Sequence, residues 1–256
     1  MANYSIPGPL NLEEHSPLVD EGTMCRAVSP TPGSVAAPRK PPPLHTVEDL
    51  FRMCFVPLGV ESPKELAVAA ETLGVEIAAI QAVAAVETEN EAGNTRIYLG
   101  RPSILFERHH FNRHTGGAFD QFPDISNRDS GGFGAYSSQY EKLERAHALH
   151  PDAALKSASW GKYQILGSNF QEAGYSSVRA FVEAMISSPS AQLAAFVKFV
   201  QAHPLMLNAL KDKDWPTFAR LYNGREYKKS QYDTRIEKKY TEFVNKAGAV
   251  GADSKP

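Results

Sequence analysis

The sequence is poor in cysteine and has no excess of one charge. Its 256 residues include only Cys25 and Cys54, too few for the framework of bridges that stabilises small secreted domains. The 27 basic and 29 acidic residues give a net charge of −2. A protein dedicated to nucleic acid or to an anionic membrane usually carries a basic excess. We therefore expect no disulfide framework and no nucleic-acid partner.

Long apolar runs are also absent. No window approaches the roughly 18 uninterrupted apolar residues that a membrane-spanning helix needs. The N-terminal "MANYSIPGPLNLEEHSPLVDEG" lacks the basic start and apolar run of a secretory signal. We expect a protein made in the cytoplasm that does not insert into a membrane. If its substrate lies outside the cytoplasm, another agent has to deliver it.

Proline is concentrated near the N-terminus, in residues 1–44, which end in "SPTPGSVAAPRKPPPLH". Closely spaced prolines remove backbone donors and favour extended conformations, so this segment is predicted to be a flexible arm. A short helical lead-in is predicted for 45–61, one main domain for 62–246, and a disordered tail for 247–256. The chain length permits one sizeable core with such appendages.

Helical patterns dominate the main domain. In "SPKELAVAAETLG", Ser62 and Glu65 have the spacing of a capping box, and Gly74 is expected to end the helix. "VEIAAIQAVAAVE" is almost wholly apolar and predicts a buried helix that ends at Glu87. Short strands are predicted in "IYLGRPSILFERHHF" and a loop in "TGGAFDQFPDISNRDSGGFG". Helices are predicted in "SSQYEKLERAHALH", "DAALKSAS", "SSVRAFVEAMISS", "SAQLAAFVKFVQAH", "PLMLNALKD", "DWPTFARLYNG" and "EYKKSQYDTRIEKKYTEFVNKA".

Glu87 follows an apolar run and is the first of three closely spaced carboxylates, with Glu89 and Glu91. A carboxyl group desolvated against an apolar wall has a raised pKa and can remain protonated near neutral pH as a general acid. The alternative interpretation is a solvated helix end. Glu89 and Glu91 lack this wall, so we expect them at the surface or at the rim of a cleft.

Two later segments have features of a carbohydrate site. "SASWGKYQILGSN" interleaves small residues with Trp160, Tyr163 and Gln164. Aromatic faces suit sugar rings, and amides suit hydroxyl and N-acetyl groups, although a turn around a buried tryptophan has the same pattern. "FARLYNGREY" places Tyr222 and Asn223 at the end of an amphipathic helix, which could equally be a simple helix terminus.

In this order, the segments resemble the lysozyme-like superfamily, which includes goose-type lysozymes and soluble lytic transglycosylases. The Glu-Ser, Gly-Leu-Met-Gln-Ile and Ala-Tyr-Asn-Ala-Gly motifs of those families correspond to "ET", "GKYQI" and "LYNG" here. Closer still is the resemblance to the N-acetylmuramidase domain family of phage endolysins and antibacterial effectors, which covers about residues 62–243. It rests on "VETENEAG", "GRPSILFERHHFNRHTGGAFD", "PDIS", "SQYEKL", "ALKSASWGKYQILG" and "YNGREY". One departure is "TEN" after the glutamate, where the family usually has Ser-Gly-Gly.

The resemblance implies a mainly α (α+β), lysozyme-like fold and a hydrolase that cleaves peptidoglycan between N-acetylmuramic acid and N-acetylglucosamine. By position, Glu87 matches the general acid, and Gln164, Tyr222 and Asn223 match residues that hold the sugar and the attacking group. A lytic transglycosylase, which forms an anhydro sugar, is the enzymatic alternative. A cell-wall binding module without activity is the other alternative.

The expected partner is the peptidoglycan glycan strand, and a monomer without cofactor is expected. Two settings are compatible with a chain that lacks an export signal. One is a phage endolysin released through a holin, and the other is an antibacterial effector injected into the periplasm by a secretion machine and countered by an immunity protein. The proline-rich arm favours the effector slightly, because it has the composition of an interdomain linker.

Glu107, in the predicted strand of "SILFERHHF", is the candidate second carboxylate. An inverting base would lie about 6.5–9.5 Å from Glu87 and a retaining nucleophile about 5–5.5 Å. An ion pair with Arg108 or Arg101 is the structural alternative. Three loop residues are rival carboxylates: Asp120, Asp124 and Asp129.

Histidines cluster in "HHFNRHTGG", where His110 and His114 are separated by one helical turn and His109 adjoins them. The segment lacks the glutamate of a zinc-protease helix and has no cysteine partner. We therefore assign no metal and expect structural or cleft-edge histidines.

Overall fold

A computed structural model describes residues 47–50, 60–88 and 101–252 of the chain. The predicted arm and most of the lead-in lie outside the described residues. The same holds for Cys25, Cys54, Glu89 and Glu91, so the expectations for these residues stay predictions.

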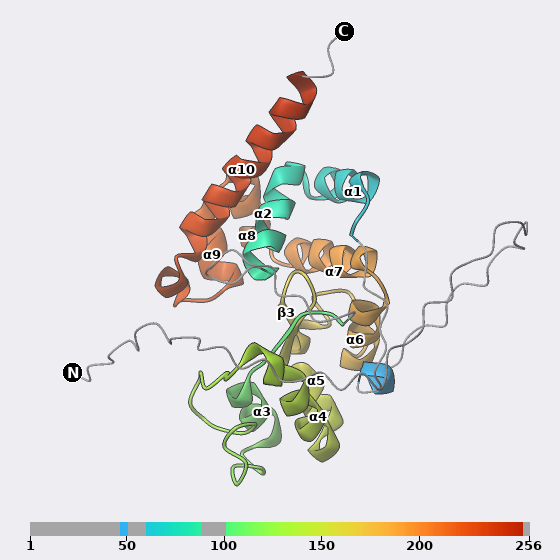
Figure 1. Ribbon diagram of the computed structural model, residues 1–256, viewed down its shortest axis with the longest axis vertical. Coiled ribbons are helices and arrows are strands. Elements are labelled where there is room, and N and C mark those ends of the chain that lie inside the picture. Colours follow the sequence, from blue (N-terminus) through green and yellow to red (C-terminus); the bar gives the residue numbers. More distant parts are fainter. Residues whose placement is uncertain (1–46, 51–59, 89–100, 253–256) are drawn as a thin grey trace, which may run out of the picture. The chain divides into compact units, whose positions relative to one another are not determined.

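The described part is mainly helical, with one small sheet (Figure 1). The α-helices are α1 (Pro63–Leu73), α2 (Ile77–Thr88), α3 (Arg108–Thr115), α4 (Gln139–Leu149), α5 (Pro151–Lys156), α6 (Val178–Ser187), α7 (Pro189–Gln201), α8 (Pro204–Asp212), α9 (Trp215–Tyr222) and α10 (Tyr232–Ala252). Short 3-10 helices are η1 (Val47–Leu50), η2 (Tyr136–Ser138), η3 (Gly167–Asn169) and η4 (Tyr227–Ser230). The strands are β1 (Ile104–Phe106), β2 (Ala158–Trp160) and β3 (Ile165–Leu166). The predicted mainly α (α+β) class is confirmed.

Helix α1 begins with the predicted capping box. The Ser62 hydroxyl accepts a hydrogen bond from the Glu65 backbone N–H at 3.2 Å, and the Glu65 carboxylate accepts one from the Ser62 N–H at 2.7 Å. Gly74 ends the helix with φ of 66°, a left-handed conformation that favours glycine. Both boundaries follow from side-chain chemistry, which is why the sequence predicts them.

Helix α2 forms the centre of the fold that positions the site. Its side chains Ile80, Ala82 and Val83 have no exposed surface, as expected for a helix that is apolar on every face. Helix α10 packs along α2, and the two are drawn side by side in Figure 1. The burial of α2 and its packing against α10 therefore fix the direction in which the C-terminal end of α2 points.

The sheet is antiparallel, with strand order β1-β2-β3. Ile104 lies opposite Trp160, and Ser159 lies opposite Leu166. The sequence did not predict β2 and β3, because short strands depend on pairing with distant residues more than on local propensity. Between them the chain turns with positive φ at Gly161 (73°) and at Gln164 (47°).

Residue 167 is the point where the chain leaves β3 and lies against helix α5. A Cβ atom at Gly167 would fall 2.0 Å from the backbone carbonyl oxygen of Leu155. Only a residue without a side chain fits this close approach of two backbone segments.

Two boundaries differ from the sequence prediction. The segment around β1 is strand only as far as Phe106, because α3 begins directly afterwards at Arg108. The expected disordered tail from 247 is also corrected, since α10 continues to Ala252. The later helices agree with the predicted segments, because proline, serine or aspartate marks many of their starts.

No single helix among the described residues is long and apolar enough to cross a membrane. Two bent helix pairs, α1 with α2 and α7 with α8, pass such a test only by length and composition.

Candidate active site

A cleft of about 630 Å³ opens between the end of α2, the sheet and the segment that follows α9. Five of the seven residues predicted for the site line it: Glu87, Glu107, Gln164, Tyr222 and Asn223. Three segments that are far apart in the sequence therefore meet at one cavity. Its size suits a ligand the size of a sugar unit or two.

Glu87 stands in the last turn of α2, half-buried and next to the buried Val86. The hydroxyl of Tyr232, the first residue of α10, donates a hydrogen bond to its Oε1. One turn further along α10, Arg235 donates from Nη2 to the carbonyl oxygen of Val86 at 3.2 Å. The first turn of α10 therefore fixes both the backbone and the carboxylate at the end of α2.

Tyr232 is a site residue that the sequence analysis missed. Its side chain is 3 % exposed, and burial, together with the negative charge of Glu87, raises the pKa of its phenol well above the ordinary value. The hydroxyl therefore remains a neutral donor at working pH. The sequence does contain a pattern that could have identified it: Tyr232, Ile236 and Tyr240 are spaced four residues apart, which predicts one apolar face of a helix. In the structure Tyr232 and Ile236 are buried and Tyr240 is partly buried.

Tyr232→Phe is expected to lower kcat/KM on peptidoglycan by about 10–100-fold, because a hydrogen bond to a charged group contributes about 1.5–3 kcal/mol. The ring still fills its buried position, so the fold should persist. Initial rates of turbidity loss of permeabilised cells would measure the effect. Tyr240→Phe, on the same helix but outside the cleft lining, is the matched control. Equal rates for Tyr232→Phe and the unaltered protein would show that the contact does not orient Glu87 for catalysis.

Tyr222 is hydrogen-bonded to the backbone next to Gln164. The Tyr222 hydroxyl donates to the Tyr163 carbonyl oxygen at 2.5 Å, directly before the left-handed Gln164. The Gln164 Nε2 donates to the carbonyl oxygens of Gly161 at 2.7 Å and Ser103 at 3.2 Å. Both amide hydrogens are used in this way, which leaves Oε1 as the atom that Gln164 offers to a ligand.

Trp160 and Tyr163 do not line the cleft, which corrects the expectation that they contact substrate. Trp160 has no exposed surface, and its Nε1 donates to the Leu155 carbonyl oxygen at 3.0 Å. Tyr163 is 1 % exposed and stacks on Phe196, with ring centroids 4.4 Å apart. Both rings lie in the core behind the cleft. This arrangement agrees with the alternative interpretation of the segment, a turn around a buried tryptophan.

Asn223 follows the last residue of α9 and is exposed to solvent. Its Nδ2 donates to the Ser230 hydroxyl at 3.5 Å, a long hydrogen bond. Because this contact is weak, the amide can turn toward a ligand at low cost. Asn223 is thus the most exposed of the five predicted residues that line the cleft.

Glu107 occupies the N-cap position of α3 rather than a strand, and its side chain makes no capping hydrogen bond. Burial raises the pKa of its carboxyl to about 7, against the opposing effect of a hydrogen bond with Ser159. The alternative of an ion pair between Glu107 and Arg108 or Arg101 is not found, because both arginines make other contacts. Arg108 donates from Nη1 to the Pro123 carbonyl oxygen, and the Arg101 guanidinium lies 4.9 Å from the centre of the Tyr140 ring.

The loop aspartates do not line the cleft. Asp120 accepts hydrogen bonds from Asn112 and Ser126, and Asp124 forms an ion pair with Arg145. Asp129 donates its backbone N–H to Asn127. Among the described residues, Glu107 is therefore the only carboxylate besides Glu87 that lines the cleft.

Glu107→Gln is expected to stabilise the protein at high pH. The folded-state pKa of about 7 lies above the ordinary 4.5, so the contribution of this group to stability is full below pH 4.5 and is lost as the pH rises through 7. The loss amounts to about 3 kcal/mol. Urea unfolding should give similar midpoints for variant and parent at pH 4 and a higher midpoint for the variant at pH 8. Exposed Glu172→Gln is the control, and parallel pH profiles for Glu107→Gln and the parent would contradict the expectation.

A carboxylate at the end of a buried helix and a second carboxylate beside a small sheet thus line one cleft, and the comparisons with known proteins assign the fold that carries them to the glycoside hydrolases. A model of the N-acetylmuramidase family matches residues 76–244. The chain therefore belongs to the N-acetylmuramidase family, whose members are peptidoglycan hydrolases.

Among solved structures, the crystal structure of the Burkholderia AP3 phage endolysin is similar. The TM-score is 0.63 at 37 % sequence identity, and the match covers 73 % of this chain and 72 % of that chain. No curated protein matches this chain. The predicted lysozyme-like fold and the family resemblance are both confirmed.

Proposed function

We propose that the protein hydrolyses the β-1,4 bond between N-acetylmuramic acid and N-acetylglucosamine, with Glu87 as the general acid. The observation that carries the proposal is that Glu87, oriented by Tyr232, shares one cleft with Glu107, Gln164 and Asn223. Glu87 would protonate the glycosidic oxygen as the bond breaks. An acid that is fixed in direction at the end of a rigid, buried helix loses little entropy in reaching that oxygen.

We assign Glu107 as the base that activates a water molecule. Its support is that it is the only other described carboxylate in the cleft lining. With a pKa of about 7, the carboxyl is partly ionised at neutral pH and is well matched to accept a proton there. The Gln164 Oε1 and the Asn223 amide would hold hydroxyl and N-acetyl groups of the sugar.

Product analysis tests the reaction. We expect digested peptidoglycan to carry reducing-end muramic acid. Mass spectrometry would identify it by its mass and by the change in that mass when borohydride reduces the sugar end. An anhydro product, one water lighter, would show instead that the substrate's own C6 hydroxyl attacks, as in a lytic transglycosylase. Undigested strands under conditions where the protein binds them would support the inactive binding module.

We further propose a bacteriolytic role. The likeness to a phage endolysin supports release at phage lysis over injection as an effector. The neighbouring genes would distinguish the two settings. A holin gene beside the coding sequence would support an endolysin, whereas a secretion-system gene with an adjacent immunity gene would support an effector.

A further inference from the structure

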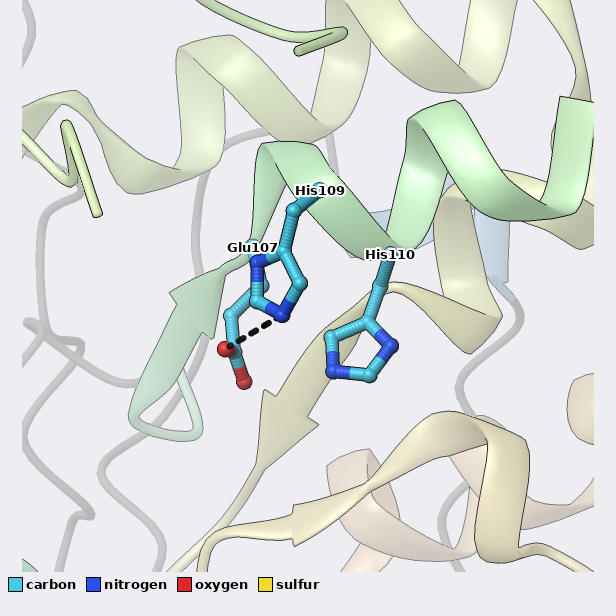
Figure 2. A group of neighbouring side chains, drawn as sticks. All are labelled: Glu107, His109 and His110. Atoms are coloured by element: carbon cyan, nitrogen blue, oxygen red, sulfur yellow. Dashed lines mark ion pairs between the residues drawn. The ribbon is translucent and has the colours of Figure 1, made fainter. Parts of the chain in front are cut away.

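Glu107, His109 and His110 form a cluster of three metal-ligating side chains at the start of α3. One ligand atom from each residue lies within 4.8 Å of the other two. In Figure 2 both imidazole rings extend from α3 toward the Glu107 carboxylate, and the dashed line joins His109 Nε2 to Glu107 Oε2 at 3.8 Å. His110, three positions after the N-cap, lies on the same side of the first turn as Glu107, and the His109 ring reaches the carboxylate through the contact of its Nε2.

The donor set suits a transition-metal ion. Two imidazoles and one carboxylate are the protein ligands of many zinc sites, with a fourth position left open. Zinc bonds of about 2.0–2.1 Å in tetrahedral geometry place ligand atoms about 3.3 Å apart, so these side chains would have to draw together by an ångström or so. The Glu107 carboxylate does not cap the helix, so its movement would break the hydrogen bond with Ser159 but no capping bond.

A further observation shows which nitrogen of His109 takes part in the cluster. The contact with Glu107 is made by Nε2, and the other nitrogen, Nδ1, is buried and has no hydrogen-bond partner among the described residues. Nε2 is therefore the atom that His109 offers to an ion in the cluster.

The position of the cluster connects it to the chemistry. Glu107 and His110 both line the cleft that holds Glu87. A bound ion would occupy the carboxylate that has to accept a proton from water, and its open coordination position would face the cavity.

We propose that Glu107, His109 and His110 bind a zinc-class divalent ion at the wall of the cleft, and that the bound ion inhibits cleavage. The inhibition rests on the proposed function, whereas the binding does not. Because no described residue accepts a hydrogen bond from His109 Nδ1 to orient the ring, we expect a dissociation constant in the micromolar range. Outer hydrogen bonds to metal-ligating histidines typically change affinity by about 10–100-fold.

Metal binding is tested on the full chain after treatment with EDTA. Titration with Zn²⁺ in a calorimeter should show one site per chain, and Co²⁺ should give a visible absorption band that Zn²⁺ removes. His110→Ala should weaken binding at least tenfold. The matched control is His114→Gln, one turn further along α3 and exposed, which should leave binding unchanged.

Three results would overturn the site: no binding at 100 µM Zn²⁺, a full signal in His110→Ala, or an equal loss in His114→Gln. Inhibition is measured separately, as loss of peptidoglycan cleavage with Zn²⁺ and its recovery with EDTA, and Mg²⁺ should have no effect. Stoichiometric, His110-dependent binding supports the site even if Glu107→Gln is fully active and the assigned base is wrong. Undiminished cleavage with the site filled would overturn the inhibitory part alone.

Discussion

Glu87→Gln is expected to reduce kcat/KM on peptidoglycan by about 10²–10⁴-fold, the usual contribution of a positioned proton donor. Glutamine has nearly the same shape and can still accept the hydrogen bond from Tyr232, so the end of α2 should keep its structure. What it cannot do is give a proton to the leaving oxygen. The loss should therefore fall on the chemical step and leave the affinity for the glycan strand largely unchanged.

The measurement pairs two readouts on the same protein. Turbidity loss of permeabilised cells reports cleavage, and sedimentation with insoluble peptidoglycan reports binding. Glu172→Gln, an exposed glutamate outside the cleft lining, should retain both. Full cleavage by Glu87→Gln would refute the assigned acid. Loss of binding together with cleavage would show that the substitution damages the cleft and does not isolate the proton transfer.

Gly167→Ala is expected to lower the free energy of unfolding by about 3 kcal/mol or more. The added methyl carbon would lie 2.0 Å from the Leu155 carbonyl oxygen, far inside van der Waals contact. Overpacking of a core usually costs about 1–3 kcal/mol, and the upper end applies when the clashing atom cannot rotate away. Here the clashing atom belongs to the backbone of α5, so β3 and α5 would have to separate.

Urea denaturation, followed by far-ultraviolet circular dichroism, would show the effect as a lower midpoint. Gly248→Ala is the control, because it lies in α10 with no atom near the new Cβ. There alanine should be neutral or stabilise by up to about 1 kcal/mol. An unchanged midpoint for Gly167→Ala would mean that the close approach relaxes without loss of packing.

The sequence predicted those elements whose causes are local. The capping box at Ser62 and Glu65 is contained in four residues, and the unbroken apolar run of α2 is contained in one helix. Glu87 could be singled out for the same reason, since the apolar wall and the carboxylate are adjacent in the chain. The order of the three motifs then sufficed to predict the fold class.

What the sequence could not show depends on contacts between distant residues. The pairing of Trp160 opposite Ile104 decides whether its ring faces the cleft or the core. The amino-acid composition of the segment around Trp160 is compatible with both orientations, so it could not distinguish them. Glu107 was placed in a strand because "ILF" precedes it, and a mainly polar helix such as α3 has little apolar periodicity to reveal its start. Tyr232 was missed because its partner, Glu87, lies in another helix 145 positions away.

The contact between Tyr232 and Glu87 also links the candidate acid to the last described helix. Helix α10 leaves the ribosome after every other described element, and it both packs along α2 and supplies the hydroxyl that orients the carboxylate. A nascent chain that ends before Tyr232 has all the residues of the cleft except this donor and Arg235. During synthesis, the orientation of Glu87 is therefore completed last, when the first turn of α10 packs against the end of α2.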